Sequence, residues 1–174
     1  HLLHMVRTAQ RVFGNDLEWS VLAAGRHQMA MCTHAALLGG NVRDRVRVYA
    51  GIYTAPDPLA ARDEMDALRE QWGITAFKLS PFRIDLHAHR WGEVVRTSAE
   101  YFRLLRETVR PDYEIAFDAH AKVFEPKQAI QLGNALAPYD PLFFEEPIRP
   151  ENIEAMGEVK RQIEGLLPVA IACG

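Results

Sequence analysis

Two short stretches, YEIAFDAH at residues 113–120 and LFFEEP at residues 142–147, decide the fold of this chain. Each reads as a buried strand of mainly apolar residues that ends in acidic side chains. A carboxylate at the end of an apolar strand must be compensated, because burying an unpaired charge is costly. A divalent metal ion is the simplest compensating group, so the two stretches together predict a metal site.

Strands and helices alternate around these two stretches. We expect strands at residues 45–52, 74–79, 113–118, 142–145 and 168–171. Helices follow the first four strands and begin near Pro58, Trp91, Pro126 and Ile153. Strands that are separated by long helices pair in parallel. The chain is therefore an α/β protein, built either as a doubly wound sheet or as a (β/α) barrel.

The helix after the first strand has the clearest boundaries. Asp57 supplies an N-cap and Pro58 a first-turn proline, and the helix continues to Trp72. We expect four apolar residues at helical spacing to form its buried face: Leu59, Met65, Leu68 and Trp72. The first forty residues are also helical in pattern, with a stop near Gly14.

Two features favour the barrel over the doubly wound sheet. No glycine-rich phosphate loop follows the first strand, as a nucleotide-binding open sheet would require. Polar residues gather instead at the carboxyl ends of several different strands, where barrel enzymes build their sites. Five strands make about half of an eight-stranded barrel. We therefore place residues 41–174 in the first half of a TIM-like barrel domain.

Composition narrows the classes of function. The 174 residues are 48% hydrophobic and 25% charged, which suits an ordinary globular core. The net charge of −3 and the pI near 6.2 argue against binding to nucleic acid or an anionic membrane. Cys32 and Cys173 are far apart, and neither a membrane-length apolar run nor a leader segment is evident. We expect a cytoplasmic protein with a small-molecule partner.

Alternation of side chains along the strands brings the polar residues to one face. Lys78 and Ser80 share the inward face of the second strand, and Asp118 takes that face on the third. His120 joins Asp118 if the third strand reaches that far. Glu145 has the same facing on the fourth strand. Lys78, Asp118, His120 and Glu145 are therefore expected to converge at one mouth.

Each of these residues also has a purely structural interpretation. Asp118 could cap a turn, and Glu145 with Glu146 could begin a solvated loop. A lone His120 is more often a hydrogen-bonded structural histidine, although its pKa suits acid–base work. Lys78 at a strand end could extend to water. A purely structural role for all four residues together is less frequent than such a role for any one of them, because the four fall on successive strands with the same facing.

Oxygen ligands at strand ends suit a hard cation. Because no Cys-His cluster occurs, Mg²⁺ is favoured over Zn²⁺, with Asp118 and Glu145 as ligands. Two carboxylates rarely suffice, so a third ligand is expected.

The order and spacing of four motifs resemble the enolase superfamily, in its mandelate racemase and muconate lactonizing enzyme subgroup. These motifs are FKLS at 77–80, FDAH at 117–120, FEEP at 144–147 and PVAIACG at 168–174. The resemblance implies a (β/α)7β barrel preceded by an α+β capping domain, whose helical part would be residues 1–40. It implies Asp118 and Glu145 as the first two Mg²⁺ ligands, with the third directly after Gly174.

The resemblance is greatest to the acid-sugar dehydratases of the galactonate, mannonate and gluconate type. It implies that Mg²⁺ binds the substrate carboxylate and stabilises the enediolate formed when a base removes the α-proton. His120, within the Asp-x-His pattern, would be the general acid for loss of the β-hydroxyl. Lys78 would stabilise the enolate or the carboxylate, and Lys122 and Glu146 would be further substrate contacts. A homo-oligomer is implied as well.

Several departures leave other functions open. Racemases of the subgroup carry Lys-x-Lys on the second strand, whereas Ser80 stands at the second position here. Related dehydratases continue Asp-x-His with Gly-Arg, whereas Ala121 and Lys122 follow here. The alternatives are a racemase, epimerase or cycloisomerase of the same superfamily, or a non-catalytic sugar-acid-binding homologue. The segment around Cys32 and Thr33 also looks about ten residues shorter than the family pattern.

Overall fold

A computed structural model describes residues 2–14, 28–39, 47–53, 55–163 and 165–171. The chain forms two compact units, one of residues 1–47 with 172–174 and the other of residues 48–171. In the first unit, α1 spans Leu2–Phe13 and α2 spans Gln28–Leu37. The first two residues of the first predicted strand, 45 and 46, lie outside the described residues. All the candidate site residues belong to the second unit.

The second unit is built on one parallel sheet of five strands in the order β1-β2-β3-β4-β5. The strands are β1 (Ala50–Gly51), β2 (Ala76–Leu79), β3 (Glu114–Asp118), β4 (Phe144–Glu145) and β5 (Val169–Ala170). Each pairs in parallel with the next along the chain. They are shorter than the sequence predicts, but all five lie within the predicted ranges.

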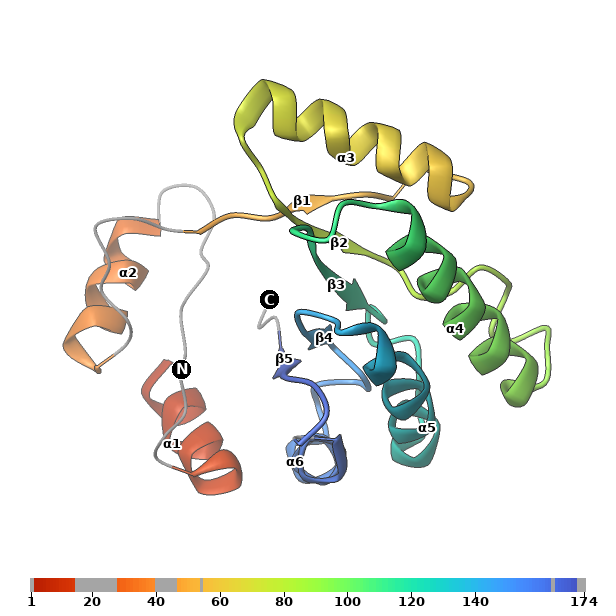
Figure 1. The fold of residues 1–174 in the computed structure, drawn as a ribbon. Helices are drawn as coiled ribbons and strands as arrows, with labels where there is room; N and C mark the ends of the chain where they lie inside the picture. Colours follow the sequence, from red (N-terminus) through yellow and green to blue (C-terminus); the bar gives the residue numbers. More distant parts are fainter. Residues whose placement is uncertain (1, 15–27, 40–46, 54, 164, 172–174) are drawn as a thin grey trace. The chain divides into compact units, whose positions relative to one another are not determined.

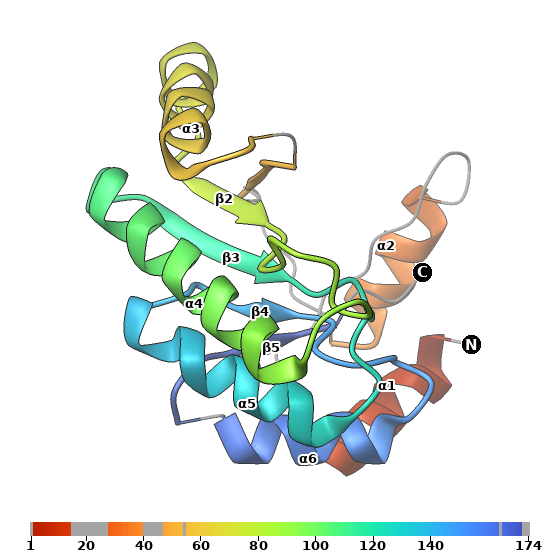
Figure 2. The same cartoon turned by 90° about the vertical axis from the view of Figure 1, so that its right-hand side faces the viewer.

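Four helices connect the strands: α3 (Pro58–Trp72), α4 (Trp91–Thr108), α5 (Pro126–Leu136) and α6 (Ile153–Ile163). A 3-10 turn, η2 (Ala137–Tyr139), follows α5. Figures 1 and 2 show the helices following one another around the outer side of the curved sheet. A doubly wound sheet would carry helices on both faces. The sequential strand order and the one-sided helices confirm the partial barrel.

The ends of α3 follow directly from its sequence. The Asp57 side chain accepts hydrogen bonds from the backbone N–H groups of Leu59 and Ala60, both at 2.9 Å. Gly73 ends the helix with a φ of 70°, a left-handed conformation that glycine adopts readily. The predicted buried face is wrong at both ends, because Leu59 is 57% exposed and Trp72 68% exposed. Only the middle turns are covered, through Ala61 and Met65.

Aromatic rings on the outer face of the sheet pack against the helices. The Phe117 ring lies 4.3 Å from that of Phe144 and 5.8 Å from that of Phe102 on α4. Gly133 lets α5 approach α6 closely, since a Cβ there would lie 3.1 Å from the Ile163 side chain. This packing fixes the strands whose ends carry the polar residues. In the part of the chain that the structure describes, no helix has the length and apolarity that a bilayer crossing needs.

Candidate functional site

Lys78 binds two carboxylates at the ends of β3 and β4. Its Nζ lies 2.9 Å from Oδ2 of Asp118 and 2.7 Å from Oε2 of Glu145. All three residues are buried, with Asp118 only 2% exposed. The two carboxylates therefore share one cation, and the structure confirms that these three side chains converge.

The strand register explains this convergence. Asp118 pairs directly with Glu145 across β3 and β4, so both side chains emerge at the same level of the sheet. Lys78 pairs with Ala116, two residues before Asp118 on the same face, and its long stem spans the remaining distance. The alternation predicted from the sequence is thus sufficient to place the three charged groups.

The environment of Lys78 determines its protonation. Burial acts to lower the pKa of the ammonium, but hydrogen bonds to Glu145 and Asp118 and their negative charges outweigh it. The pKa of Lys78 is raised above its usual value as a result. Lys78 is therefore a permanent cation at neutral pH. A cation at this position stabilises nearby negative charge.

His120 lies beside Asp118, but not because the strand continues. β3 ends at Asp118, and His120 occupies the following turn with a φ of 51°. Its backbone N–H donates to Oδ1 of Asp118 at 2.7 Å, and its Nδ1 lies 3.2 Å from Oδ2 of the same carboxylate. The side chain is 53% exposed. Since Nδ1 faces Asp118, the Nε2 atom is left to meet a substrate.

Left-handed backbone conformations concentrate at this place. Among the described residues other than glycine, those with positive φ are His120, Ala121, Asp140 and Glu146. Three of these four lie within three residues after the end of β3 or β4. Such conformations are unfavourable for residues with a Cβ, and they persist where the surrounding structure demands them. The turn after β3 brings the His120 side chain to Asp118.

Glu146 and Lys122 differ in their relation to the cluster. Burial raises the pKa of Glu146, and the negative charges of Asp118 and Glu145 raise it further, against the opposing effects of His120 and Lys78. Glu146 therefore lies within electrostatic reach of the cluster. Lys122 is exposed in the turn after β3, where its backbone N–H donates to the carbonyl of Ala119. The roles of both in binding substrate stay predictions.

Two tyrosines that flank β1, to which the sequence assigned no role, also lie near the site. The Tyr49 ring centroid lies 5.2 Å from Nζ of Lys78 and 5.8 Å from the ring of Phe143. The Tyr53 ring lies 6.2 Å from that of His120. Strand alternation gives Tyr49 and Tyr53 the same facing, and that signal was present in the sequence.

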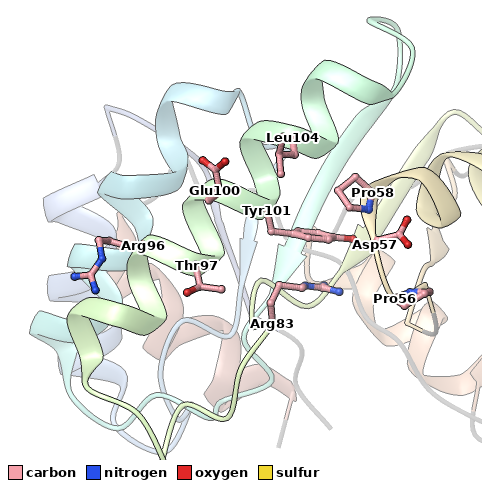
Figure 3. A pocket seen from close by; sticks show the side chains of 9 residues that line it. All are labelled: Pro56, Asp57, Pro58, Arg83, Arg96, Thr97, Glu100, Tyr101 and Leu104. Atoms are coloured by element: carbon pink, nitrogen blue, oxygen red, sulfur yellow. The ribbon is translucent and has the colours of Figure 1, made fainter.

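A separate pocket of about 490 Å³ lies on the outer side of the unit (Figure 3). It is bordered by the start of α3, the loop after β2 and α4, and Arg83 reaches into it over the ring of Tyr101 at 3.8 Å. None of the four converging residues lines it. The candidate site is therefore the cluster at the strand ends.

The oxygen donors of the cluster meet part of what a metal ion needs. Among the described residues, no group of three His, Cys, Asp or Glu side chains gathers in a way that could hold an ion. Asp118 and Glu145 nevertheless provide buried oxygen donors of the kind that Mg²⁺ prefers. Their charges are balanced by the Lys78 ammonium, which shows that this position accommodates a cation. Asp118 and Glu145 are therefore suited to be two of the ligands of a Mg²⁺ ion.

Comparison with protein families divides the chain into two parts. The family described as Enolase C-terminal domain-like matches residues 60–174, which include the whole cluster. A different family, the beta-keto acid cleavage enzymes, matches residues 1–44. The two matches do not overlap, and the interval between them contains the boundary between the two compact units.

Two relatives resemble the barrel part. A D-gluconate/D-galactonate dehydratase of Picrophilus torridus is 33% identical over 139 residues, which are 78% of this chain and 34% of that protein. The crystal structure of an enolase from Agrobacterium radiobacter, provisionally named a galactarate dehydratase, contains Na⁺ and L-malate. It is 68% identical with a TM-score of 0.71, over 79% of this chain and 34% of that one. The chain thus spans about a third of the length of these relatives.

A shorter match is to a protein of another kind. A 3,5-dioxohexanoate:acetyl-CoA acetone transferase of Paraburkholderia graminis is 41% identical over 59 residues, which are 34% of this chain and 18% of that protein. The apparent shortening at Cys32 and Thr33 lies inside the segment that matches the second family. That residues 1–40 belong to a capping domain stays a prediction. The family match to residues 1–44 offers an alternative, a relationship to the beta-keto acid cleavage enzymes.

Proposed function

Because the chain belongs to the enolase superfamily, through its Enolase C-terminal domain-like region, we propose that it acts as a Mg²⁺-dependent acid-sugar dehydratase. One observation carries the proposal: Lys78 and His120 both contact Asp118, which together with Glu145 forms a buried carboxylate pair. The cluster combines a cation, a candidate acid and two metal ligands within one mouth. Acid-sugar dehydration needs these three functions.

The reaction removes the α-proton of a sugar acid and expels the β-hydroxyl as water. The resulting enol becomes a 2-keto-3-deoxy acid. A Mg²⁺ ion held by Asp118 and Glu145 would supply a Lewis acid for the substrate carboxylate. Lys78 adds a fixed positive charge that stabilises the negative charge developing on the substrate. Lys78 is given this electrostatic role, so the base for the α-proton is assigned to no described residue.

His120 fits the role of general acid. Asp118 faces Nδ1 and fixes which nitrogen is presented outward. Nε2 would hold the proton that leaves with the β-hydroxyl. The half-exposed imidazole can recover this proton from solvent after each turnover. A buried histidine would lack that path.

The substrate class follows from the relatives. The protein from Picrophilus torridus is named for D-gluconate and D-galactonate, and the structure from Agrobacterium radiobacter holds L-malate, a hydroxy diacid. We therefore place the substrate among aldonic and aldaric acids. A cytoplasmic location and a homo-oligomeric state stay predictions.

The test is incubation of the full-length protein, which must also supply the base and the third metal ligand, with Mg²⁺ and D-gluconate, D-galactonate, D-xylonate or galactarate, followed by an assay for 2-keto-3-deoxy products. We expect product from at least one acid. Loss of product with His120→Gln and Asp118→Asn, but not with the matched exposed variant His89→Gln, would support the assigned roles.

Other outcomes separate the alternatives. Solvent deuterium that enters the α-position without elimination would indicate a racemase or epimerase. Binding of an acid with no exchange at all would indicate a non-catalytic binding protein. Either result would overturn the dehydratase proposal.

A further inference from the structure

Tyr53 is the aromatic neighbour of the candidate acid. Its ring meets the His120 ring nearly edge to face, with centroids 6.2 Å apart and planes at 66°. Tyr53 follows β1, whereas His120 lies in the turn after β3, so the contact joins the segments that follow two different strands. Tyr53 is 57% exposed, and its ring is therefore not part of the hydrophobic core. A ring at this position needs an explanation other than burial.

Gly51 makes room for that ring. A Cβ on Gly51 would lie 2.2 Å from one ring carbon of Tyr53 and 2.9 Å from another. Real Cβ atoms do not approach other atoms so closely, so any larger residue at 51 would displace the ring. The φ of Gly51 is not in the left-handed region, and its backbone would accept alanine without strain. The glycine is therefore required by the ring of Tyr53, not by the chain path.

The His120 side chain needs lateral support. On one side, Nδ1 faces Asp118 at 3.2 Å. With half of its surface exposed, the imidazole would otherwise leave this position by rotation about its side-chain bonds. The Tyr53 ring stands against the imidazole and restricts that rotation. Aromatic pairs of this geometry contribute about 0.5–1.5 kcal/mol, enough to shift a rotamer population several-fold.

We infer that Tyr53 is a positioning residue, which holds the His120 imidazole beside Asp118, and that Gly51 seats Tyr53 for this purpose. The inference rests on the proposed function, because it assigns His120 the role of acid. The aromatic ring, not the hydroxyl, makes the contact with His120. Tyr53→Phe should therefore keep the position of His120 and the value of kcat. The expected kinetic signature is a change in kcat with little change in KM, since Tyr53 acts through His120.

The first test is independent of turnover. In the NMR spectrum of the full chain, with the His120 ring signals identified by His120→Gln, we expect cross-relaxation between the Tyr53 and His120 rings. Tyr53→Phe should keep the contact and Gly51→Ala should abolish it, although Gly51→Ala retains Tyr53. Absence of the contact in the natural chain, or its survival in Gly51→Ala, would overturn the inference.

The second test is a double-mutant cycle on the dehydratase assay. Tyr53→Leu and Gly51→Ala should each lower kcat about tenfold, and the combined variant should be no worse than either alone. Gly92→Ala is the matched control, because a Cβ there meets only Arg96, at an ordinary 3.7 Å. Additive losses, or a change confined to KM, would reject a positioning role. If the natural chain dehydrates none of the acids, the proposed function fails while the NMR test still decides the position of Tyr53.

Discussion

The Nζ of Lys78 lies 2.7 Å from Oε2 of Glu145, although the two residues are 67 positions apart in sequence. The same nitrogen lies 2.9 Å from Asp118. One ammonium thus occupies the space between the two proposed metal ligands. Metal binding and the lysine contact would therefore draw on the same two carboxylates, and this competition can be measured.

Removing the lysine should strengthen Mg²⁺ binding. We expect Lys78→Met to raise the affinity of the full-length protein for Mg²⁺ at least about tenfold. A tenfold change in affinity corresponds to about 1.4 kcal/mol, and the repulsion between Mg²⁺ and a nearby ammonium is larger than that. Isothermal titration calorimetry measures this. Lys127→Met, an exposed change on α5, is the matched control and should have no effect. Equal or weaker binding by Lys78→Met would contradict the competition.

Without metal, the same change should weaken the fold. Lys78→Met leaves two buried carboxylates without a cation, and breaking a buried charge pair costs about 3 kcal/mol of unfolding free energy. Urea denaturation in EDTA measures the loss. Adding Glu145→Gln to Lys78→Met should recover part of it by removing one of the unpaired charges. A double variant less stable than Lys78→Met would show that packing, not charge, dominates.

The sequence was sufficient for most of the cluster. Apolar strands that end in Asp118 and Glu145 predicted the carboxylate pair, and strand alternation predicted Lys78. For His120 the prediction depended on a longer strand, whereas the structure places it in a strained turn held by Asp118. Tyr53 was assigned no role because alternation gives the face of a strand residue but not the path of the segment after β3, which brings His120 beside Tyr53. The prediction that Leu59 and Trp72 are buried was wrong, because periodicity does not show how much of a helix the sheet covers.

A hydrogen bond between α3 and the start of β3 should make stability depend on pH. Asp66 accepts from the hydroxyl of buried Tyr113, which lowers the pKa of Asp66 despite partial burial, with help from Arg110. A lowered pKa in the folded state adds stability that is present above the unfolded value of about 3.9 and lost as pH falls through the folded value.

We therefore expect Asp66→Asn to lower the unfolding free energy by about 1 kcal/mol at pH 7. The difference from the natural chain should shrink progressively below about pH 5. Urea denaturation between pH 3 and pH 7 measures it. Asp63→Asn is the matched control, since Asp63 is exposed on the same helix and pairs only with its neighbour Arg62 among described residues. A difference that is the same at every pH would refute the titration of Asp66 as its source.

Arg106 on α4 secures the segments that lead into β3 and β4. Its guanidinium donates to the carbonyls of Tyr113, at 2.6 Å, of Tyr139, at 2.8 Å, and of Asp140. A lysine cannot reproduce this fork of donors, because its ammonium is a single point. We expect Arg106→Lys to lower the unfolding free energy by about 2 kcal/mol, as two of three charged hydrogen bonds are lost.

The consequence should reach the site. Because β3 and β4 carry Asp118 and Glu145, loosening their entry segments should weaken Mg²⁺ binding by the Arg106→Lys variant, even though Arg106 touches neither carboxylate. Arg103→Lys is the matched control, since Arg103 lies on the same helix and makes exposed pairs with Glu100 and Glu107. Exposed pairs contribute little, so this control should change neither stability nor metal affinity measurably. Equal effects of the two substitutions would show that the carbonyl contacts of Arg106 do not fix the strands.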